Sequence, residues 1–76
     1  MEYYFEEALL AARRKGIVNA RKLIREEYWP NSNPSSQRSN LANMIEERTT
    51  PTVPFLVLFA KICKCSTDFI CYGKEI

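Results

Sequence analysis

The chain has 76 residues and a formal net charge of +2, with 46% hydrophobic and 26% charged residues. This length excludes a two-domain protein, because so short a chain buries only about 60% of its unfolded surface, and the composition excludes intrinsic disorder. Histidine is absent, which removes the imidazole of Ser–His and Cys–His nucleophile pairs and of mixed Cys/His zinc sites. We therefore expect one domain over residues 1–76 that is not an enzyme.

Positive charge is concentrated in one segment of the chain. Three acids occur in the first seven residues, and a run of cations without an intervening acid then follows, formed by Arg13, Arg14, Lys15, Arg21, Lys22 and Arg25. A local basic patch is the electrostatic signature of a surface that binds a phosphate backbone. The same charges are also compatible with a solvated helix face, so charge patterning alone leaves both interpretations open.

Three cysteines lie near the C-terminus, at Cys63, Cys65 and Cys71. An odd number cannot pair completely, and a metal site would lack its fourth ligand and the usual spacing. The longest apolar run, residues 53–60, is far shorter than the roughly 18 residues that a membrane span needs, and no signal peptide precedes it. We expect reduced thiols in the cytoplasm, with no metal, no cofactor and no membrane association.

Two amphipathic helices are predicted in the N-terminal part. Residues 2–15 carry an apolar stripe at three- and four-residue spacing, formed by Phe5, Ala8, Leu9 and Ala12. Gly16 ends this helix. Asn19 offers an N-cap for a second helix that Pro30 stops, with a stripe formed by Ala20, Leu23 and Ile24.

The third predicted helix, residues 34–47, has an unusual polar face. Asn33 followed by Pro34 is typical of a helix start. Its apolar face combines Leu41, Met44 and Ile45 with Arg48, and its opposite face carries Ser36, Ser39, Asn40 and Asn43. Glu and Lys usually fill a solvated helix face, because they are better helix formers than Ser or Asn. Ser, Asn, Gln and Arg hydrogen-bond base edges in the DNA major groove. A polar face without any partner is the alternative.

Two further helices are predicted in the C-terminal part. The fourth begins near Pro54 and is apolar nearly all round, which predicts a buried central helix. Ser66 or Thr67 can cap a short fifth helix over residues 68–72, which Gly73 ends in a left-handed conformation. No strand pattern is present. The sequence therefore predicts an all-α fold, a compact bundle of about five short helices.

The segment from Pro51 to Gly73 resembles, without a gap, the end of Cro-like helix-turn-helix domains of the XRE family, the phage-repressor type. The matching residues are Leu56, Phe59, Ala60, Lys61, Cys65, Ser66, Asp68, Ile70, Tyr72 and Gly73. The resemblance covers residues 18–73 and implies a lambda-repressor-like fold in which Cys63 and Cys65 occupy aliphatic core positions. The chain departs from the family by a lengthened turn after the second helix, where we expect Trp29 to pack onto the edge of the bundle.

The resemblance implies a sequence-specific DNA-binding transcriptional regulator, a repressor of phage or mobile-element type, whose third helix enters the major groove. The implied base contacts are Gln37, Arg38, Ser39, Asn40 and Asn43. The expected phosphate contacts are Asn19, Arg21, Lys22, Ser35, Ser36, Arg48 and Thr49. The implied partner is double-stranded DNA, bound by a homodimer on an inverted repeat, with no small-molecule substrate. The alternative is a protein-interaction module, an antitoxin or an anti-repressor, with the same helical fold.

Overall fold

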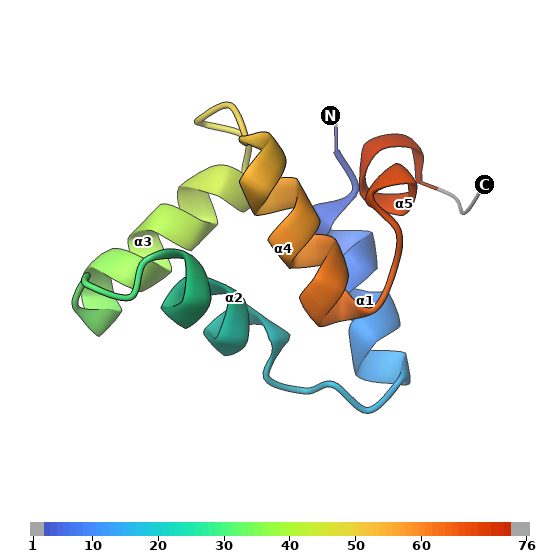
Figure 1. The fold of residues 1–76 in the computed structure, drawn as a ribbon, viewed down its shortest axis with the longest axis horizontal. Coiled ribbons are helices and arrows are strands. Elements are labelled where there is room, and N and C mark those ends of the chain that lie inside the picture. The colour runs from blue at the N-terminus through green and yellow to red at the C-terminus, as the bar shows by residue number, and fades with distance from the viewer. Residues whose placement is uncertain (1–2, 74–76) are drawn as a thin grey trace.

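Five helices follow one another in the computed structural model, which describes residues 3–73 (Figure 1). They are α1 (Phe5–Arg14), α2 (Ala20–Tyr28), α3 (Pro34–Ile45), α4 (Val53–Cys63) and α5 (Thr67–Tyr72). No strand occurs within residues 3–73. The prediction of an all-α fold with five short helices is therefore confirmed. None of these helices is long and apolar enough to cross a bilayer.

Local side-chain chemistry explains most helix starts. The side chains of Asn33, Thr52 and Ser66 accept hydrogen bonds from the backbone N–H three residues later and so cap α3, α4 and α5. Asn19 occupies the N-cap position of α2, but its side chain makes no capping bond, so that part of the prediction is wrong. The predicted range of α1 began at residue 2, which lies outside the described residues, but Tyr3 and Tyr4 are not helical and α1 begins only at Phe5.

Two helix ends depend on left-handed backbone conformations. Gly73 takes a φ of 81° at the end of α5, as predicted. α3 ends at Ile45, two residues earlier than predicted, because Glu47 adopts a left-handed φ of 61° that no helix can continue. Arg48 consequently lies outside the helix and is exposed, so its predicted place on the apolar face of α3 is wrong.

The core lies where α1, α2, α4 and α5 meet. Its largest fully buried side chains are Phe5, Phe55, Phe59, Ile24, Ile70 and Cys63. The ring of Phe5 lies 4.9 Å from that of Phe59 and 5.8 Å from that of Phe55, measured between centroids, so an aromatic cluster fills the centre. The predicted apolar stripe of α1 supplies Phe5, Ala8 and Ala12 to this core.

The fourth helix packs against three other helices and keeps one side uncovered. Figure 1 shows α4 between α2 on one side and α1 with α5 on the other, and α4 packs against all three. Phe55, Phe59 and Cys63 are fully buried, yet Val53 is 71% exposed and Val57 is 51% exposed. The predicted buried central helix therefore does pack between the other helices, but it is buried only in part. The described residues contain no further helix to cover the outer side of α4.

The cysteines lie in and beside this core. Cys63 is fully buried, Cys65 and Cys71 are half-buried, and no disulfide joins them. Burial raises the pKa of the Cys63 thiol to about 12; Cys65 adds to the rise, and Lys15 opposes it. Lys15 also donates to the carbonyl groups of Cys63 and Lys64 at the end of α4. Cys63 therefore behaves as an apolar core residue, as the sequence predicted.

Candidate nucleic-acid interface

The long connection between α2 and α3, residues 29–33, is fixed to the core by aromatic rings. The rings of Tyr28 and Trp29 lie 5.1 Å and 6.0 Å from that of Phe55. The hydroxyl groups of Tyr28 and Thr52 are 2.6 Å apart and form a hydrogen bond. The prediction that Trp29 packs onto the bundle is confirmed. The extra length of this turn is therefore ordered structure that sets where α3 begins.

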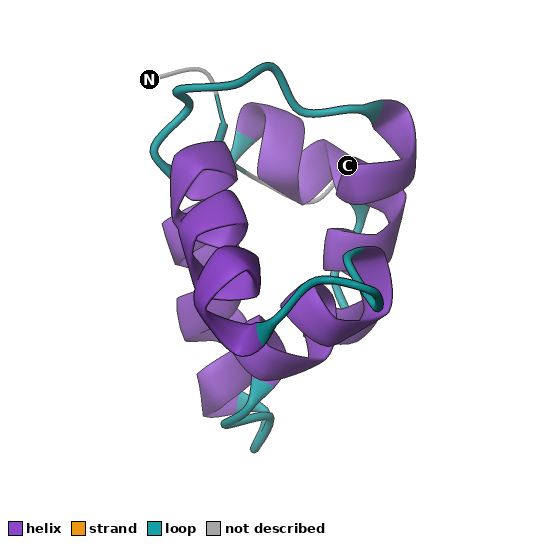
Figure 2. Cartoon of the chain, turned by 90° about the vertical axis from the view of Figure 1, so that its left-hand side faces the viewer, coloured by secondary structure: helices purple, strands orange, loops and turns teal. Residues whose placement is uncertain are grey.

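The third helix forms one end of the molecule. α3 packs principally against α2, and Figure 2 looks onto the end that these two helices form. Leu41, Met44 and Ile45 are its buried apolar residues. Ser35, Ser36, Arg38 and Ser39 are exposed, and Asn40 and Asn43 are half-buried. The outward face of α3 is therefore accessible and carries uncharged polar groups, with Arg38 at its edge.

Gln37 does not belong to this outward face. Its side chain is only 7% exposed, and its Nε2 donates to the Trp29 carbonyl oxygen at 2.8 Å. Residue 37 precedes Leu41 by four positions and Met44 by seven, so it shares their inward face. The implied base contact of Gln37 is therefore corrected: this side chain anchors the turn before α3 and does not reach solvent.

The residues after α3 are already engaged with one another. Arg48 donates from Nη1 to Oδ1 of Asn43 at 3.3 Å, and its Nη2 lies 2.7 Å from Oε1 of Glu46. Thr49 Oγ1 lies 3.0 Å from the sulfur of Met44. The side chains of Arg48 and Glu46 are 68% and 52% exposed, so solvent screens this pair strongly. A phosphate at Arg48 would therefore compete with a weak partner.

Cations from three helices line two adjoining hollows. The first lies between α1 and α2, and its charged lining residues are Arg13, Arg21, Lys22 and Arg25. The second lies between α2 and α3 and is lined by Arg21, Arg25, Arg38, Leu41 and Ala42. Both share Arg21 and Arg25, and none of the described residues that line either hollow is acidic. We call the set Arg13, Arg21, Lys22, Arg25 and Arg38 the basic surface.

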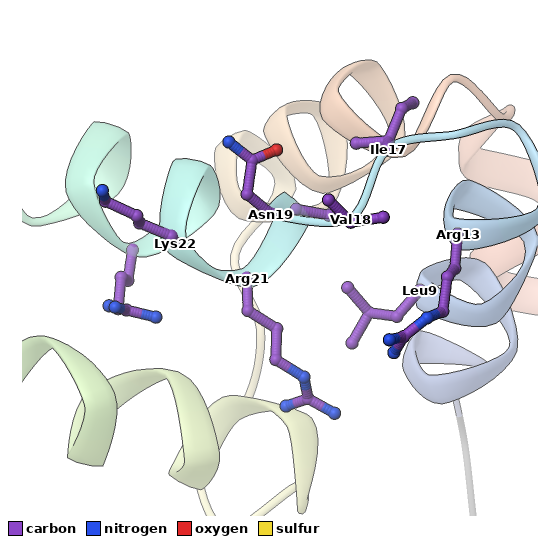
Figure 3. Close-up of a pocket in the computed structure, with 9 residues that line it drawn as sticks. Leu9, Arg13, Ile17, Val18, Asn19, Arg21 and Lys22 are labelled. Atoms are coloured by element: carbon purple, nitrogen blue, oxygen red, sulfur yellow. The ribbon is translucent and has the colours of Figure 1, made fainter.

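The side chains of this surface differ in orientation. Figure 3 shows Arg13 and Arg21 directed into the first hollow, whereas Asn19 and Lys22 point away from it. Arg21 Nη2 lies 2.9 Å from Oε1 of Glu6, but both side chains are more than half exposed, so this ion pair is weak. Nε of Arg25 is buried and has no hydrogen-bond partner among the described residues. A buried donor without an acceptor is unusual in a folded protein.

Sequence reasoning identified part of this surface. Arg21 and Lys22 were expected to hold phosphates, and Asn19 is exposed beside them in the first hollow. Arg13 and Arg25 were not among the expected phosphate contacts, although both belong to the acid-free run of cations. Arg25 follows Arg21 by four residues, which is the spacing that places two side chains on one helix face. That spacing is the signal from which their common face could have been predicted.

Neither a metal-ligating cluster nor a known relative indicates what the basic surface binds. Within residues 3–73 no group of three or more metal-ligating side chains lies close together. Comparison with protein-family models, with curated proteins and with solved structures finds no match for this chain. What the basic surface binds is therefore inferred from its own side chains.

Proposed function

We propose that this protein binds double-stranded DNA sequence-specifically and regulates transcription as a cytoplasmic repressor of the Cro-like, phage-repressor type. The observation that carries this proposal is the basic surface, where five cations line two adjoining hollows without an acid, next to the uncharged polar face of α3. Phosphates favour such cations, and base edges favour such polar side chains. Repression follows from occupancy, because a bound repressor excludes other proteins from its site.

Each side chain has a role in this proposal. Arg13, Arg21, Lys22 and Arg25 come from α1 and α2 and hold phosphates. Arg38 is the one cation of the basic surface that α3 supplies, and it reaches a base edge together with Ser39 and Asn43. A guanidinium can donate two parallel hydrogen bonds to O6 and N7 of guanine. Phosphate contacts give affinity for any sequence, and the α3 side chains give preference.

The resemblance of residues 51–73 to Cro-like domains supports DNA over other polyanions. It concerns the part of the chain that packs behind α2, since α4 contacts α2 directly. The lengthened turn is no obstacle to this mode of binding, because Tyr28 and Trp29 fix it to Phe55 and leave α3 exposed.

Selection of bound sequences from a random duplex pool, followed by two substitutions, tests the proposal. Arg38→Ala should cost about 1–3 kcal/mol on the selected site and relax the preference at one base position. Lys22→Ala should weaken binding to all sequences alike and lower the salt slope by about one unit. Competition between the selected duplex and a scrambled duplex measures both effects.

Two results would count against this assignment. If Arg38→Ala lowers the affinity for both duplexes by the same factor, Arg38 holds a phosphate and reads no base. If the protein has no affinity for any duplex, or an affinity that salt does not change, the protein-interaction module is the better explanation of the fold.

A further inference from the structure

A hollow beside the second half of α3 is separate from the two that the basic surface lines. Its volume is about 280 Å³, nearly twice the roughly 150 Å³ that holds one benzene ring. None of the described residues that line it is charged. We call it the α3 hollow, and its lining includes Tyr28 and Trp29 at the end of α2, Asn40 and Asn43 of α3, and Thr49 and Thr50 before α4.

The two aromatic residues of the α3 hollow are held in place by the core. Tyr28 and Trp29 are half-buried, and their ring centroids lie 5.0 Å apart. The hydroxyl group of Tyr28 is hydrogen-bonded to Thr52, and the ring of Trp29 lies beside that of Phe55. Both rings are therefore ordered before a ligand arrives. Ordered aromatic rings at an uncharged hollow favour a planar, neutral ligand that can stack on them.

The amides of the α3 hollow retain unused hydrogen-bonding groups. Asn43 Oδ1 accepts from Arg48 Nη1 at 3.3 Å, but Asn43 Nδ2 makes no hydrogen bond with a described residue. The side chain of Asn40 makes none at all within residues 3–73, although it is half-buried. The Asn40 amide therefore offers an acceptor and a donor side by side to a ligand.

We propose that the α3 hollow binds an adenine ring. Adenine is a neutral, planar double ring whose N6 donates and whose N7 accepts, and an asparagine amide pairs with this edge. Guanine presents two acceptors on the same edge and pairs with Arg or Lys, but none of the described residues that line the hollow is a cation. Cytosine and thymine present only one polar group there. Asn40 therefore selects adenine, and Tyr28 and Trp29 supply the stacking surface.

The adenine ring can belong to a free nucleoside or to an unstacked base of bound DNA. The α3 hollow adjoins the polar face of α3, because Asn40 and Asn43 belong to both. The DNA source rests on the proposed function, whereas binding of a free nucleoside does not. In neither case is the adenine altered chemically, so the hollow is a binding site and not an active site.

The fluorescence of Trp29 tests the proposal without DNA. Trp29 is the only tryptophan of the chain and lines the α3 hollow, so its emission reports on that hollow. Titration of the full chain with adenosine should change the emission in a saturable manner, with a Kd on the order of 0.1–1 mM for a ligand of this size. Inosine keeps the double ring but presents two acceptors, as guanine does, and should bind about fivefold more weakly or worse.

Two asparagine substitutions identify the group that selects adenine. Asn40→Ala should raise the Kd for adenosine about fivefold or more, because the paired hydrogen bonds to N6 and N7 are lost. The variant should fold, since Asn40 makes no hydrogen bond with a described residue and alanine is the better helix former. Asn19→Ala is the matched control: the Asn19 side chain makes no capping bond and lines another hollow, so its substitution should leave the Kd unchanged.

A duplex with one unpaired base identifies the source of the ring. If bound DNA supplies it, a duplex with one unpaired adenine should bind about fivefold or more tightly than the same duplex with one unpaired thymine, and Asn40→Ala should abolish this preference. If a free nucleoside supplies it, the two duplexes should bind equally. If no duplex binds, the DNA-binding proposal fails and the adenosine titration alone decides the role of the α3 hollow.

The proposal is overturned if adenosine up to about 5 mM leaves the Trp29 emission unchanged, because this concentration is several times the expected Kd. It is also overturned if Asn40→Ala and Asn19→Ala change the Kd for adenosine equally, or if inosine binds as tightly as adenosine. No DNA is present in these titrations, so their failure is separate from a failure of the DNA-binding proposal.

Discussion

Substitution of Gln37 by methionine separates a structural role of this residue from a role in DNA recognition. Methionine has a similar length and volume, so it keeps the packing of a side chain that is 7% exposed, but it cannot donate to the Trp29 carbonyl oxygen. That oxygen also accepts from the Ser32 N–H at 3.2 Å, so it keeps one partner in the variant. We therefore expect the net loss of one hydrogen bond, about 1 kcal/mol of the free energy of unfolding.

Thermal unfolding followed by circular dichroism measures this loss. In a domain of this size, 1 kcal/mol corresponds to a decrease in Tm of about 4–8 °C. Ser39→Ala is the control on the exposed side of the same helix, and it should change the free energy of unfolding by less than about 0.5 kcal/mol. Gln37→Met should leave the base preference of the protein unchanged.

The opposite pattern would refute the inward placement of Gln37. If Gln37→Met keeps the Tm of the wild type but alters the preference at one base pair, the side chain faces DNA and not the turn. The buried contact with Trp29 would then be absent from the molecule in solution.

Two further predictions concern a glycine and a buried thiol. Gly73→Ala should lower the free energy of unfolding, measured by urea denaturation, by about 1–2 kcal/mol or more. The φ of Gly73 is 81°, and a Cβ there would lie 3.0 Å from the Tyr4 ring. Gly16→Ala, at a φ of 91° with no atom within 4 Å of the added Cβ, should lose only the free energy that the left-handed backbone costs. Equal losses would show that the Tyr4 contact is unimportant. Labelling in denaturant without reductant should count three thiols, whereas Cys63 should resist labelling in the folded protein at neutral pH. The pKa of the Cys63 thiol is 9.0 in the unfolded chain and about 12 in the folded protein, so the unfolded chain loses its proton first as the pH rises. Between pH 9 and pH 12 the free energy of unfolding should therefore fall relative to that of Cys63→Val, by up to about 1.4 kcal/mol per pH unit. Parallel pH profiles of the two proteins would contradict the burial of the thiol.

The helices were predictable because local chemistry specifies them. Three helices are capped by a side chain just before their first turn: Asn33 before α3, Thr52 before α4 and Ser66 before α5. Each of these signals lies within a few consecutive residues of the sequence. The apolar spacing likewise predicted most of the buried side chains of α1 and α3, with Leu9 and Arg48 as the exceptions. Such patterns need no knowledge of what lies across the core.

The errors occurred where distant parts of the chain decide the outcome. The composition of α4 indicates an apolar helix, but only the placement of α1, α2 and α5 determines that Val57 stays uncovered. Gln37 was expected to contact a base, yet the lengthened turn supplies the Trp29 carbonyl oxygen, which accepts a hydrogen bond from the Gln37 amide. Periodicity gives the direction of a side chain and not the partner that it meets.

The sequence predicts the types of residue that form the candidate site, but not all of the particular residues that come together in it. The acid-free run of cations and the polar face of α3 can be read from the sequence, and both are part of the surface described above. The meeting of Arg25 with Arg38 depends on how α3 packs against α2. Trp29 links the two: its carbonyl oxygen accepts from Gln37 of α3, and its ring lies against Phe55, which is remote in sequence.

The salt dependence of DNA affinity for two matched variants tests the central claim most directly. Arg25→Gln and Arg14→Gln remove the same charge, but Arg25 lines both hollows of the basic surface and Arg14 lines neither. Fluorescence anisotropy of a labelled duplex over a range of salt concentrations gives the slope of log K against log salt. Arg25→Gln should reduce that slope by about 0.9, the contribution of one phosphate, and Arg14→Gln should leave it at the wild-type value. Equal slopes in all three proteins, or equal reductions in both variants, would contradict the assignment of DNA binding to this surface.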